Sequence, residues 1–394
     1  MHSMSRSEVR AILKKNIKKR IARGHPWIYS NEVSKDPGVS DGSIVDVFNQ
    51  SNQFIGKGFY CKDSKIRIRL ITRKYERIDR DFFNKRIERA WLTRKKYLAT
   101  KKQGAMRIVF ADADYLPGLI VDRYGDYLVV QFNIEGIKKF KEIIFETLEN
   151  LFKPKGIFQN STGNVENTSN GERGWITAAG VELIPFKIGE ITYFADTQGQ
   201  GTGFYLDQRD NAEKMSLYAK HKRVLDLFSY TGNSALRSLK KGASHATIVD
   251  NSKRALEIAK EMFRYNNVID KATFINENVF EYINNAKIKA DLVVLDPPSL
   301  GKLSKNKKTA LNSYKELNIR SINDIPNDGI LGMTCRSYKI SWTTWYETIN
   351  KAFIDTNRVG RLLYMGGQSV DFPSLSCIYE TSYLKFNIYM IERN

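Results

Sequence analysis

The chain has 394 residues, of which 42% are hydrophobic and 27% charged, so it is long enough for two or three domains with their own cores. An excess of 63 Lys and Arg over 43 Asp and Glu gives a net charge of +20 at pH 7, which predicts a polyanionic partner, nucleic acid before an anionic membrane. Neither an apolar run of about 18 residues nor a signal-peptide core is present, and the three scattered cysteines exclude a disulfide framework or a zinc site, so the sequence predicts a soluble cytoplasmic protein without a metal.

Residues 1–75 carry a dense cluster of basic residues followed by short apolar strands with glycine turns. Residues 66–70 alternate strictly between apolar and basic side chains. This pattern predicts a small β-barrel with one face that reads an RNA phosphate backbone, although a solvated basic face without a partner would look the same. The candidate phosphate contacts are Lys15, Lys18, Lys19, Arg20, Arg23, Arg67 and Arg69.

Residues 76–185 predict a small α+β middle domain. Apolar and basic residues recur at helical spacing over residues 78–99, and residues 137–151 read as an amphipathic helix. Between them, residues 114–131 form two apolar runs around Arg123-Tyr124-Gly125-Asp126, which predicts a hairpin. The polar stretch 160–174 reads as a loop.

Residues 186–394 predict a Rossmann-like α/β domain, organised around the strand–turn–helix–strand pattern of residues 224–250. Asp250 ends the second strand, where a carboxylate can accept hydrogen bonds from two ribose hydroxyls. The turn holds one glycine, Gly232, and Asp226 before it would repel phosphate, so a dinucleotide is disfavoured. We therefore expect S-adenosylmethionine (SAM), a nucleoside with a positive group and no phosphate, to lie against Asp226, Phe228, Thr231, Gly232 and Asp250. An ordinary βαβ crossover without a ligand is the alternative.

Three further segments complete the predicted site. Gln208 and Arg209, after the glycine-rich residues 199–203, suit the carboxylate of SAM, and Asn278 is expected near adenine. A central strand ends at Asp296-Pro297-Pro298, where two prolines force the chain out of the sheet and fix a carboxylate at its edge, and we expect Asp296 to contact SAM as well. Lys305 follows in a basic loop that we expect to contact RNA.

The whole chain resembles the bacterial SAM-dependent 23S rRNA methyltransferases that have an N-terminal PUA domain, and their 5-methylcytosine branch most of all. The matching pieces, in order, are RGHPWIYSNEV, DYLPGLIVDRYGD, GQGTGFYLDQRDN, VLDLFSYTGN, IVDNSKRALEIAKEMFRYN, VVLDPPSL, MTCRS and TSYLKF. The resemblance implies a PUA barrel (residues 1–75), a middle α+β domain (76–185) and a Rossmann-like methyltransferase domain (186–394). Asn233, Asn278 and Leu300 depart from the family pattern.

The resemblance assigns a catalytic role to Cys335, which ends a strand, and to Asp296. C5 of cytosine is a poor nucleophile, so a thiolate adds at C6 and makes the ring an enamine whose C5 takes the methyl group. Asp296 hydrogen-bonds or protonates N3 to stabilise the charge that develops on the ring. The neighbouring Arg336 is expected to lower the pKa of Cys335. A buried structural cysteine is the alternative for Cys335.

Two other functions stay open. Methylation of a guanine nitrogen in rRNA needs no cysteine, but Ser299 stands where such enzymes place an aromatic residue after the two prolines. A non-catalytic RNA-binding or ribosome assembly factor is suggested by Asn233 and Asn278. The sequence does not decide the oligomeric state, for which a homodimer is one option.

Overall fold

The computed structural model describes residues 9–15, 19–98, 104–161, 172–177, 180–285, 288–300 and 306–393. The chain divides into two compact units. Unit 1 contains Met1–Ile184, Gln200–Thr202 and Asp371–Thr381, and unit 2 contains Pro185–Gly199, Gly203–Val370 and Ser382–Asn394. In the described parts of the chain, no helix has both the length and the apolar character to span a membrane.

The first part of unit 1 is a six-stranded sheet in the order β2-β6-β5-β4-β1-β3. Its apolar side chains, which include Val45, Val47 and Ile68, form a core of their own. We predicted a barrel, but the described strands at the two edges, β2 and β3, do not pair with each other, so the sheet is open. The strands are β1 (Arg10–Leu13), β2 (Trp27–Tyr29), β3 (Val33–Lys35), β4 (Ile44–Phe48), β5 (Phe54–Tyr60) and β6 (Ile66–Thr72), with the short helix α1 (Lys19–Ala22).

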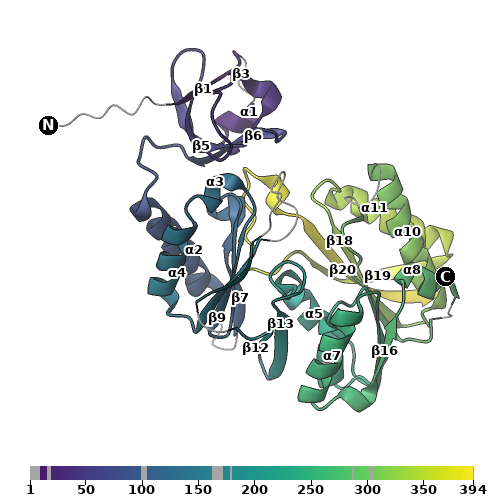
Figure 1. The fold of residues 1–394 in the computed structure, drawn as a ribbon. Coiled ribbons are helices and arrows are strands. Elements are labelled where there is room, and N and C mark those ends of the chain that lie inside the picture. Colours follow the sequence, from purple (N-terminus) through teal and green to yellow (C-terminus); the bar gives the residue numbers. More distant parts are fainter. Residues whose placement is uncertain are drawn as a thin grey trace. The chain divides into compact units, whose positions relative to one another are not determined.

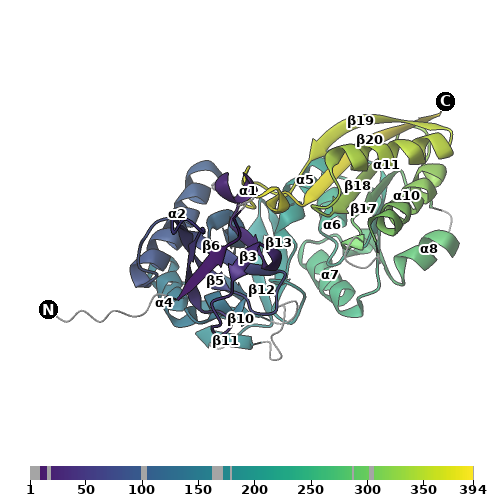
Figure 2. The ribbon, with the colours of Figure 1, turned by 90° about the horizontal axis from the view of Figure 1, so that it is seen from above.

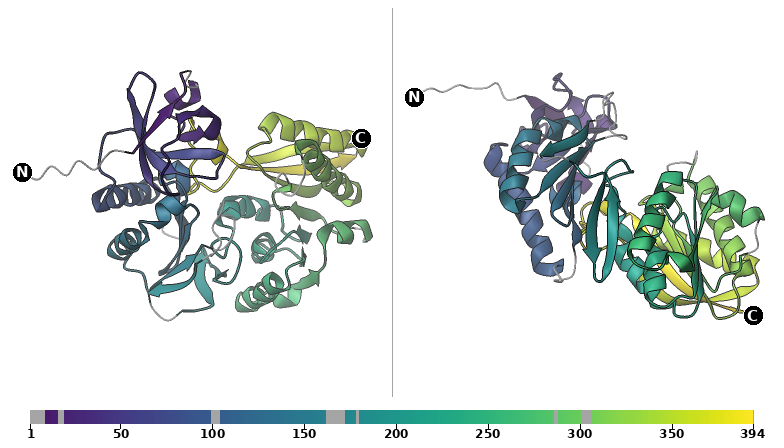
Figure 3. Two further views of the ribbon diagram at one scale, coloured as in Figure 1. Left: turned by 45° about the horizontal axis from the view of Figure 1, so that its top comes forward. Right: turned by 60° about the horizontal axis from the view of Figure 1, so that its bottom comes forward.

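The second part of unit 1 is a five-stranded sheet in the order β11-β10-β9-β8-β7, with two long helices packed beside each other (Figure 1). Figure 3 shows the same helices from two further directions. The predicted hairpin is present as β8 and β9, which pair antiparallel from Leu119↔Phe132 to Tyr124↔Tyr127. The elements are α2 (Arg80–Leu98), β7 (Ala105–Phe110), β8 (Leu119–Tyr124), β9 (Tyr127–Phe132), α3 (Glu135–Lys138), α4 (Lys141–Phe152), β10 (Gly156–Asn160) and β11 (Arg173–Thr177).

Unit 2 holds a seven-stranded sheet in the order β16-β15-β14-β17-β18-β20-β19. The first five strands of this order run parallel, and β20 pairs antiparallel with both β18 and β19. The chain order reverses between β14 and β17, which is the place where open α/β sheets bind ligands at the carboxyl ends of their strands. The strands are β14 (Arg223–Leu227), β15 (His245–Asp250), β16 (Ala272–Asn276), β17 (Leu292–Leu295), β18 (Gly329–Arg336), β19 (Arg358–Gly366) and β20 (Leu384–Arg393).

Helices cover both faces of this sheet, so its central strands are apolar on both sides. Figure 2 shows α10 and α11 on one side and α6 and α7 on the other. The predicted stripe of α7 is buried, including Ala255, Ile258 and Met262, and Ser252 caps the helix by accepting a hydrogen bond from the Ala255 N–H. The helices are α5 (Arg209–Ser216), α6 (Asn233–Lys240), α7 (Lys253–Tyr265), α8 (Val279–Asn285), α10 (Lys307–Asp324) and α11 (Trp342–Asp355); β12 (Leu183–Ile188) and β13 (Ile191–Asp196) form a separate two-stranded sheet.

These observations confirm the predicted mixed α/β fold with a Rossmann-like domain. Strand β16 begins before the predicted residue 274 and ends at Asn276, and α8 starts at Val279 within the stretch expected to leave the strand. The predicted helix over residues 137–151 is two helices, α3 and α4.

Candidate active site

Three carboxylates of unit 2 lie at the carboxyl ends of neighbouring parallel strands of the sheet. Asp226 lies near the end of β14, Asp250 ends β15, and Asp296 comes directly after β17. Because the carboxyl ends of parallel strands meet at one edge, the fold gathers the three groups. Their mutual electrostatic effects agree with this, since both Asp296 and Asp250 raise the pKa of Asp226.

The side chain of Asp226 is buried and is not exposed at the surface of the site. Its side chain is 2% exposed and accepts a hydrogen bond of 3.0 Å from the backbone N–H of Ala235, in the first turn of α6. Burial, with smaller contributions from Asp296 and Asp250, raises the pKa of Asp226 to about 8. The carboxyl group is therefore mostly protonated at neutral pH, and it stabilises the first turn of α6 through Ala235.

Asp250 organises the turn between β14 and α6. Its two oxygens accept backbone hydrogen bonds of 2.8 Å from Tyr230 and from Ser252. Phe228, Tyr230 and Gly232 have positive φ angles of 59°, 50° and 73°, so the chain turns tightly here with two non-glycine residues in the left-handed region. Each carboxylate oxygen keeps a further acceptor position, as a pair of ribose hydroxyls requires.

Asp296 is held by Arg336, the last residue of β18. The Arg336 guanidinium donates hydrogen bonds of 3.0 and 2.9 Å to the two Asp296 oxygens and one of 2.7 Å to Asp207. Tyr383 donates a further hydrogen bond of 2.6 Å to the same Asp207 oxygen. Burial lowers the pKa of Arg336, but Asp207 and Asp296 more than offset this and raise it well above its usual value. The guanidinium is a fixed positive charge between two carboxylates.

Cys335 is not brought to this cluster. Successive side chains of a strand point to opposite faces, and Arg336 takes the face of Asp296. Cys335 is fully buried on the other face, in the core that also contains Leu300, Tyr314 and Trp345. The expectation that Arg336 lowers the pKa of Cys335 is wrong, because burial raises the pKa of the thiol to about 11. A role of Cys335 as nucleophile stays a prediction.

The other predicted cofactor residues differ in how accessible they are. Gln208 is buried, donates to Thr334 (3.0 Å) and accepts from Asn211 (2.6 Å). Arg209 is 2% exposed and Thr231 is 1% exposed. The side-chain oxygen of Asn278 accepts a hydrogen bond of 2.9 Å from the Phe280 N–H at the start of α8. Of these four residues, only Asn278 is exposed. The side chains of Gln208 and Arg209 are buried, so they offer little surface to the carboxylate of SAM.

The predicted RNA contacts of unit 1 divide into two groups. Lys15, Lys19 and Arg23 are exposed. In contrast, Arg20 forms an ion pair with Glu32 and donates to the Trp27 carbonyl, so it serves the internal structure of the sheet. Arg67 and Arg69 lie 4.0 and 3.9 Å from Asp36 and Asp112, respectively. Lys18 and Lys305 lie outside the described residues.

Sequence reasoning missed Asp207, Tyr383 and the part played by Arg336. The alternation of β18 contains a usable signal, because one of two neighbouring residues must face away from Asp296. Asp207 and Tyr383 had no such signal. Asp207 meets Arg336 across 129 residues of sequence and Tyr383 across 176, so both contacts of Asp207 are long-range.

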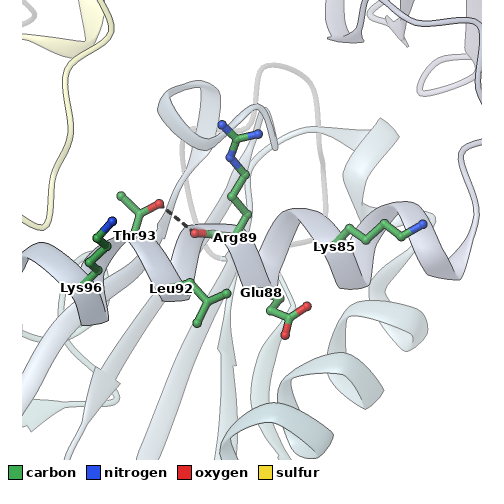
Figure 4. A pocket seen from close by; sticks show the side chains of 6 residues that line it. All are labelled: Lys85, Glu88, Arg89, Leu92, Thr93 and Lys96. Atoms are coloured by element: carbon green, nitrogen blue, oxygen red, sulfur yellow. Dashed lines mark hydrogen bonds between the residues drawn. The ribbon is translucent and has the colours of Figure 1, made fainter.

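A shallow hollow in unit 1 does not contain a cluster of carboxylates like that of unit 2. It lies on α2 in unit 1, measures about 280 Å³, and is formed by side chains of that helix alone (Figure 4). Its lining residues are Lys85, Glu88, Arg89, Leu92, Thr93 and Lys96. The candidate active site is therefore the carboxylate cluster of unit 2.

Comparison with known proteins identifies the family of the chain. A model of the PUA-like domain matches residues 11–73, and a model described as conserved hypothetical protein 95 matches residues 211–322. The ribosomal RNA large subunit methyltransferase I of Tolumonas auensis is 32% identical over 384 residues, which cover 95% of this chain and 97% of the relative. The chain belongs to the ribosomal RNA large subunit methyltransferase I family. This confirms the family resemblance found in the sequence.

Other relatives agree with this membership. The enzyme of the same name from Escherichia coli O139:H28 is 31% identical over 392 residues, covering 96% of this chain and 98% of the relative. Among solved structures, a Streptococcus mutans protein assigned as a SAM-dependent methyltransferase superposes with a TM-score of 0.83 at 21% identity, covering 97% of this chain and all of that one. A methyltransferase complexed with S-adenosylhomocysteine (SAH) gives a TM-score of 0.84 at 22% identity, with the same coverage. These two structures show a shared fold along nearly the whole chain.

Proposed function

We infer that this protein is a SAM-dependent methyltransferase of large-subunit rRNA and that it forms 5-methylcytosine in 23S rRNA. The observation that carries this is the alignment with the family over 97% of the relative's length, since it includes both the PUA-like part and the carboxylate cluster. The substrate would be met in the cytoplasm. A homodimer stays a prediction, and sedimentation velocity of the purified chain would measure it.

The residues of the site fit SAM as the cofactor. The turn after β14 has one glycine, a left-handed backbone and a carboxylate on each neighbouring strand, so it suits a nucleoside better than a pyrophosphate. Asp250 would hold the ribose hydroxyls, and Asn278, which is exposed, would contact adenine. SAM supplies an electrophilic methyl group on a positively charged sulfur. The residues that face the RNA base are Asp296 and, behind it, Arg336.

For a cytosine, Asp296 would contact the edge that carries N3 and the N4 amine, and a nucleophile is needed at C6. Cys335 is the proposed nucleophile, and the thiolate would leave again after a base removes the C5 proton. In the described structure the thiol faces the core while Arg336 occupies the face of Asp296. The covalent route therefore requires the end of β18 to rearrange and Arg336 to release Asp296.

This same observation favours a second candidate, methylation of a nitrogen on a purine base such as guanine. An amine attacks the methyl group directly and needs no thiol, so the buried position of Cys335 would not hinder this reaction. A carboxylate such as Asp296, fixed by Arg336, can accept a hydrogen bond from the attacking amine and hold it in line.

Nucleoside mass spectrometry of rRNA from cells with and without the gene distinguishes these candidates. Loss of 5-methylcytidine on deletion supports the first, and loss of a methylguanosine supports the second. If no modification is lost and calorimetry detects no SAM binding, the protein is a non-catalytic RNA-binding or assembly factor.

The role of the thiol has its own test on the purified enzyme. A Cys335→Ala variant is compared with wild type for transfer of labelled methyl groups to rRNA, with Cys61→Ala as the matched control. Loss of transfer in Cys335→Ala alone supports the covalent route, provided that the variant keeps its unfolding temperature. Unchanged transfer would exclude a Cys335 adduct.

A further inference from the structure

One aromatic side chain of unit 2, Tyr205, is exposed beside the carboxylate cluster. Its neighbours Phe204 and Leu206 are 5% and 1% exposed, whereas Tyr205 is 40% exposed. Phe204 packs edge-on against Phe186 and Tyr193, at 5.2 and 5.3 Å between ring centroids. Because the chain is anchored on both sides of Tyr205, its ring is held outward by the fold.

The ring lies between the groups expected to hold the cofactor and the base. The Arg336 guanidinium is 5.1 Å from the Tyr205 ring centroid, and Arg336 holds both Asp296 oxygens. The ring of Tyr230 packs edge-on against Tyr205 at 5.0 Å, and the Tyr230 N–H donates to Asp250.

We propose that Tyr205 is the residue on which the unstacked target base of the RNA stacks, beside the Asp296–Arg336 pair that meets the edge of the base. A base that leaves its helix loses stacking on both sides, and an aromatic ring in the site replaces part of it. The position after the two prolines cannot provide such a ring, because it is occupied by Ser299. Tyr205 is a rigid ring at the same edge of the sheet.

The RNA base is a better partner for this ring than the cofactor. The Tyr205 ring lies against the Arg336 guanidinium, which holds both oxygens of Asp296, and it packs edge-on against Tyr230, whose N–H donates to Asp250. A flat ring also matches the flat face of a base and tolerates cytosine or guanine. The inference rests on the proposed RNA methyltransferase function and does not depend on which base is methylated.

The test compares three variants of the full-length enzyme. Tyr205→Leu removes the ring, and Tyr205→Phe keeps it. Tyr265→Leu is the matched control, because Tyr265 is 62% exposed, packs edge-on against Phe194, and lies at the far end of α7 from Asp250. Each variant is assayed for the KM of rRNA and kcat with labelled SAM, and for the dissociation constant of SAM by calorimetry.

We expect Tyr205→Leu to raise the KM for rRNA by about 5- to 150-fold, the range that corresponds to one base stacked on an aromatic ring. Tyr205→Phe and Tyr265→Leu should stay within about twofold of wild type, and SAM affinity should be unchanged in all three. Unchanged KM in Tyr205→Leu overturns the proposal, and so does a weaker SAM affinity with an unchanged KM, which would assign the ring to the cofactor.

A second measurement reports stacking directly and does not require turnover by the variant. Once the methylated nucleotide is mapped, an rRNA fragment with 2-aminopurine at that position is bound to each enzyme. Stacking on Tyr205 keeps the flipped base quenched, so fluorescence should rise with Tyr205→Leu and not with Tyr205→Phe. Equal fluorescence with the wild type, Tyr205→Leu and Tyr205→Phe would reject the proposal. If wild-type protein transfers no methyl group to rRNA, the proposed function itself fails.

Discussion

The buried carboxyl group of Asp226 makes stability depend on pH in an unusual direction. Its pKa rises to about 8 on folding, mainly through burial, while an unfolded aspartate titrates near 4. The stability that this group contributes is complete below about pH 4 and is lost as the pH rises to about 8, at up to about 1.4 kcal/mol per pH unit. Asp226→Asn keeps an acceptor for the Ala235 N–H and removes this loss.

The cofactor-free Asp226→Asn variant should therefore be more stable than wild type at pH 7, by a margin that grows between pH 4 and 8. Chemical unfolding at several pH values measures the difference. Asp291→Asn is the opposite control: hydrogen bonds from Arg223 lower the pKa of Asp291, so its contribution is present above about pH 4 and lost below it. A constant difference between Asp226→Asn and wild type across this range would contradict the argument.

The thiol of Cys335 gives a second prediction for a single residue. With a pKa of about 11 and no exposed surface, only about one thiol in a thousand is ionised at pH 8. Iodoacetamide should therefore leave Cys335 unmodified in the native protein and modify it after unfolding. Cys61 and Cys377, which are both half-buried, serve as internal references in the same peptide mass spectra. Rapid native modification of Cys335 would show that the thiol reaches solvent and would favour the covalent route.

At the scale of elements, β18 presents different kinds of side chain on its two faces. The strand presents Leu331, Met333 and Cys335 to the core under α10 and α11. The alternate side chains Thr334 and Arg336 face Gln208 and Asp296. A shift of one residue in the strand would exchange Arg336 for a cysteine at the carboxylate.

Helix α2 provides a test of buried against exposed ion pairs within one element. Arg94 is 1% exposed and donates to both oxygens of Asp114, at 2.7 and 2.8 Å, and to the Asp371 carbonyl at 3.1 Å. Arg94→Met leaves Asp114 buried without its partner and should lower the free energy of unfolding by about 3–5 kcal/mol. Arg80 is also on α2 and forms an exposed ion pair with Glu146 of α4, so Arg80→Met should change stability little. Urea unfolding measures both variants. Equal decreases in the free energy of unfolding for Arg94→Met and Arg80→Met would contradict this prediction.

At the scale of the whole molecule, local patterns predicted most of the fold. The βαβ repeats of unit 2 and the β8–β9 hairpin depend on neighbouring residues, so hydrophobic spacing and turn chemistry located them. Long-range contacts were not predictable in this way. Residues 371–381 lie between β19 and β20 in the chain but belong to unit 1, where the Asp371 carboxylate accepts a hydrogen bond from the Arg107 N–H and Glu380 lies 3.2 Å from His25.

The candidate site also contains residues that the sequence predicted and residues that it did not. Asp226, Asp250 and Asp296 were found because each lies at or just after the carboxyl end of a strand that its sequence identifies. The orientation of Cys335 was not found, because the phase of a fully buried strand is invisible when both of its faces are covered by helices. Asp207 joins the site through a loop and an arginine, and no local pattern indicates such a contact.

The high net charge leads to a prediction about RNA affinity that involves the surface of α2. Lys85 and Arg89 are exposed on the helix, and Figure 4 shows the Arg89 side chain turned away from that of Glu88. If these two cations contact phosphates, Lys85→Glu with Arg89→Glu should weaken rRNA binding and reduce the slope of log K against log salt by about 1.5, since each phosphate contact contributes roughly 0.7 to 0.9. Lys289→Glu with Lys351→Glu makes the same change in net charge on exposed residues of unit 2. Filter binding between 50 and about 200 mM salt measures both slopes. Equal slopes for the two double variants would mean that α2 acts only through the overall charge of the protein and not through contacts with the RNA.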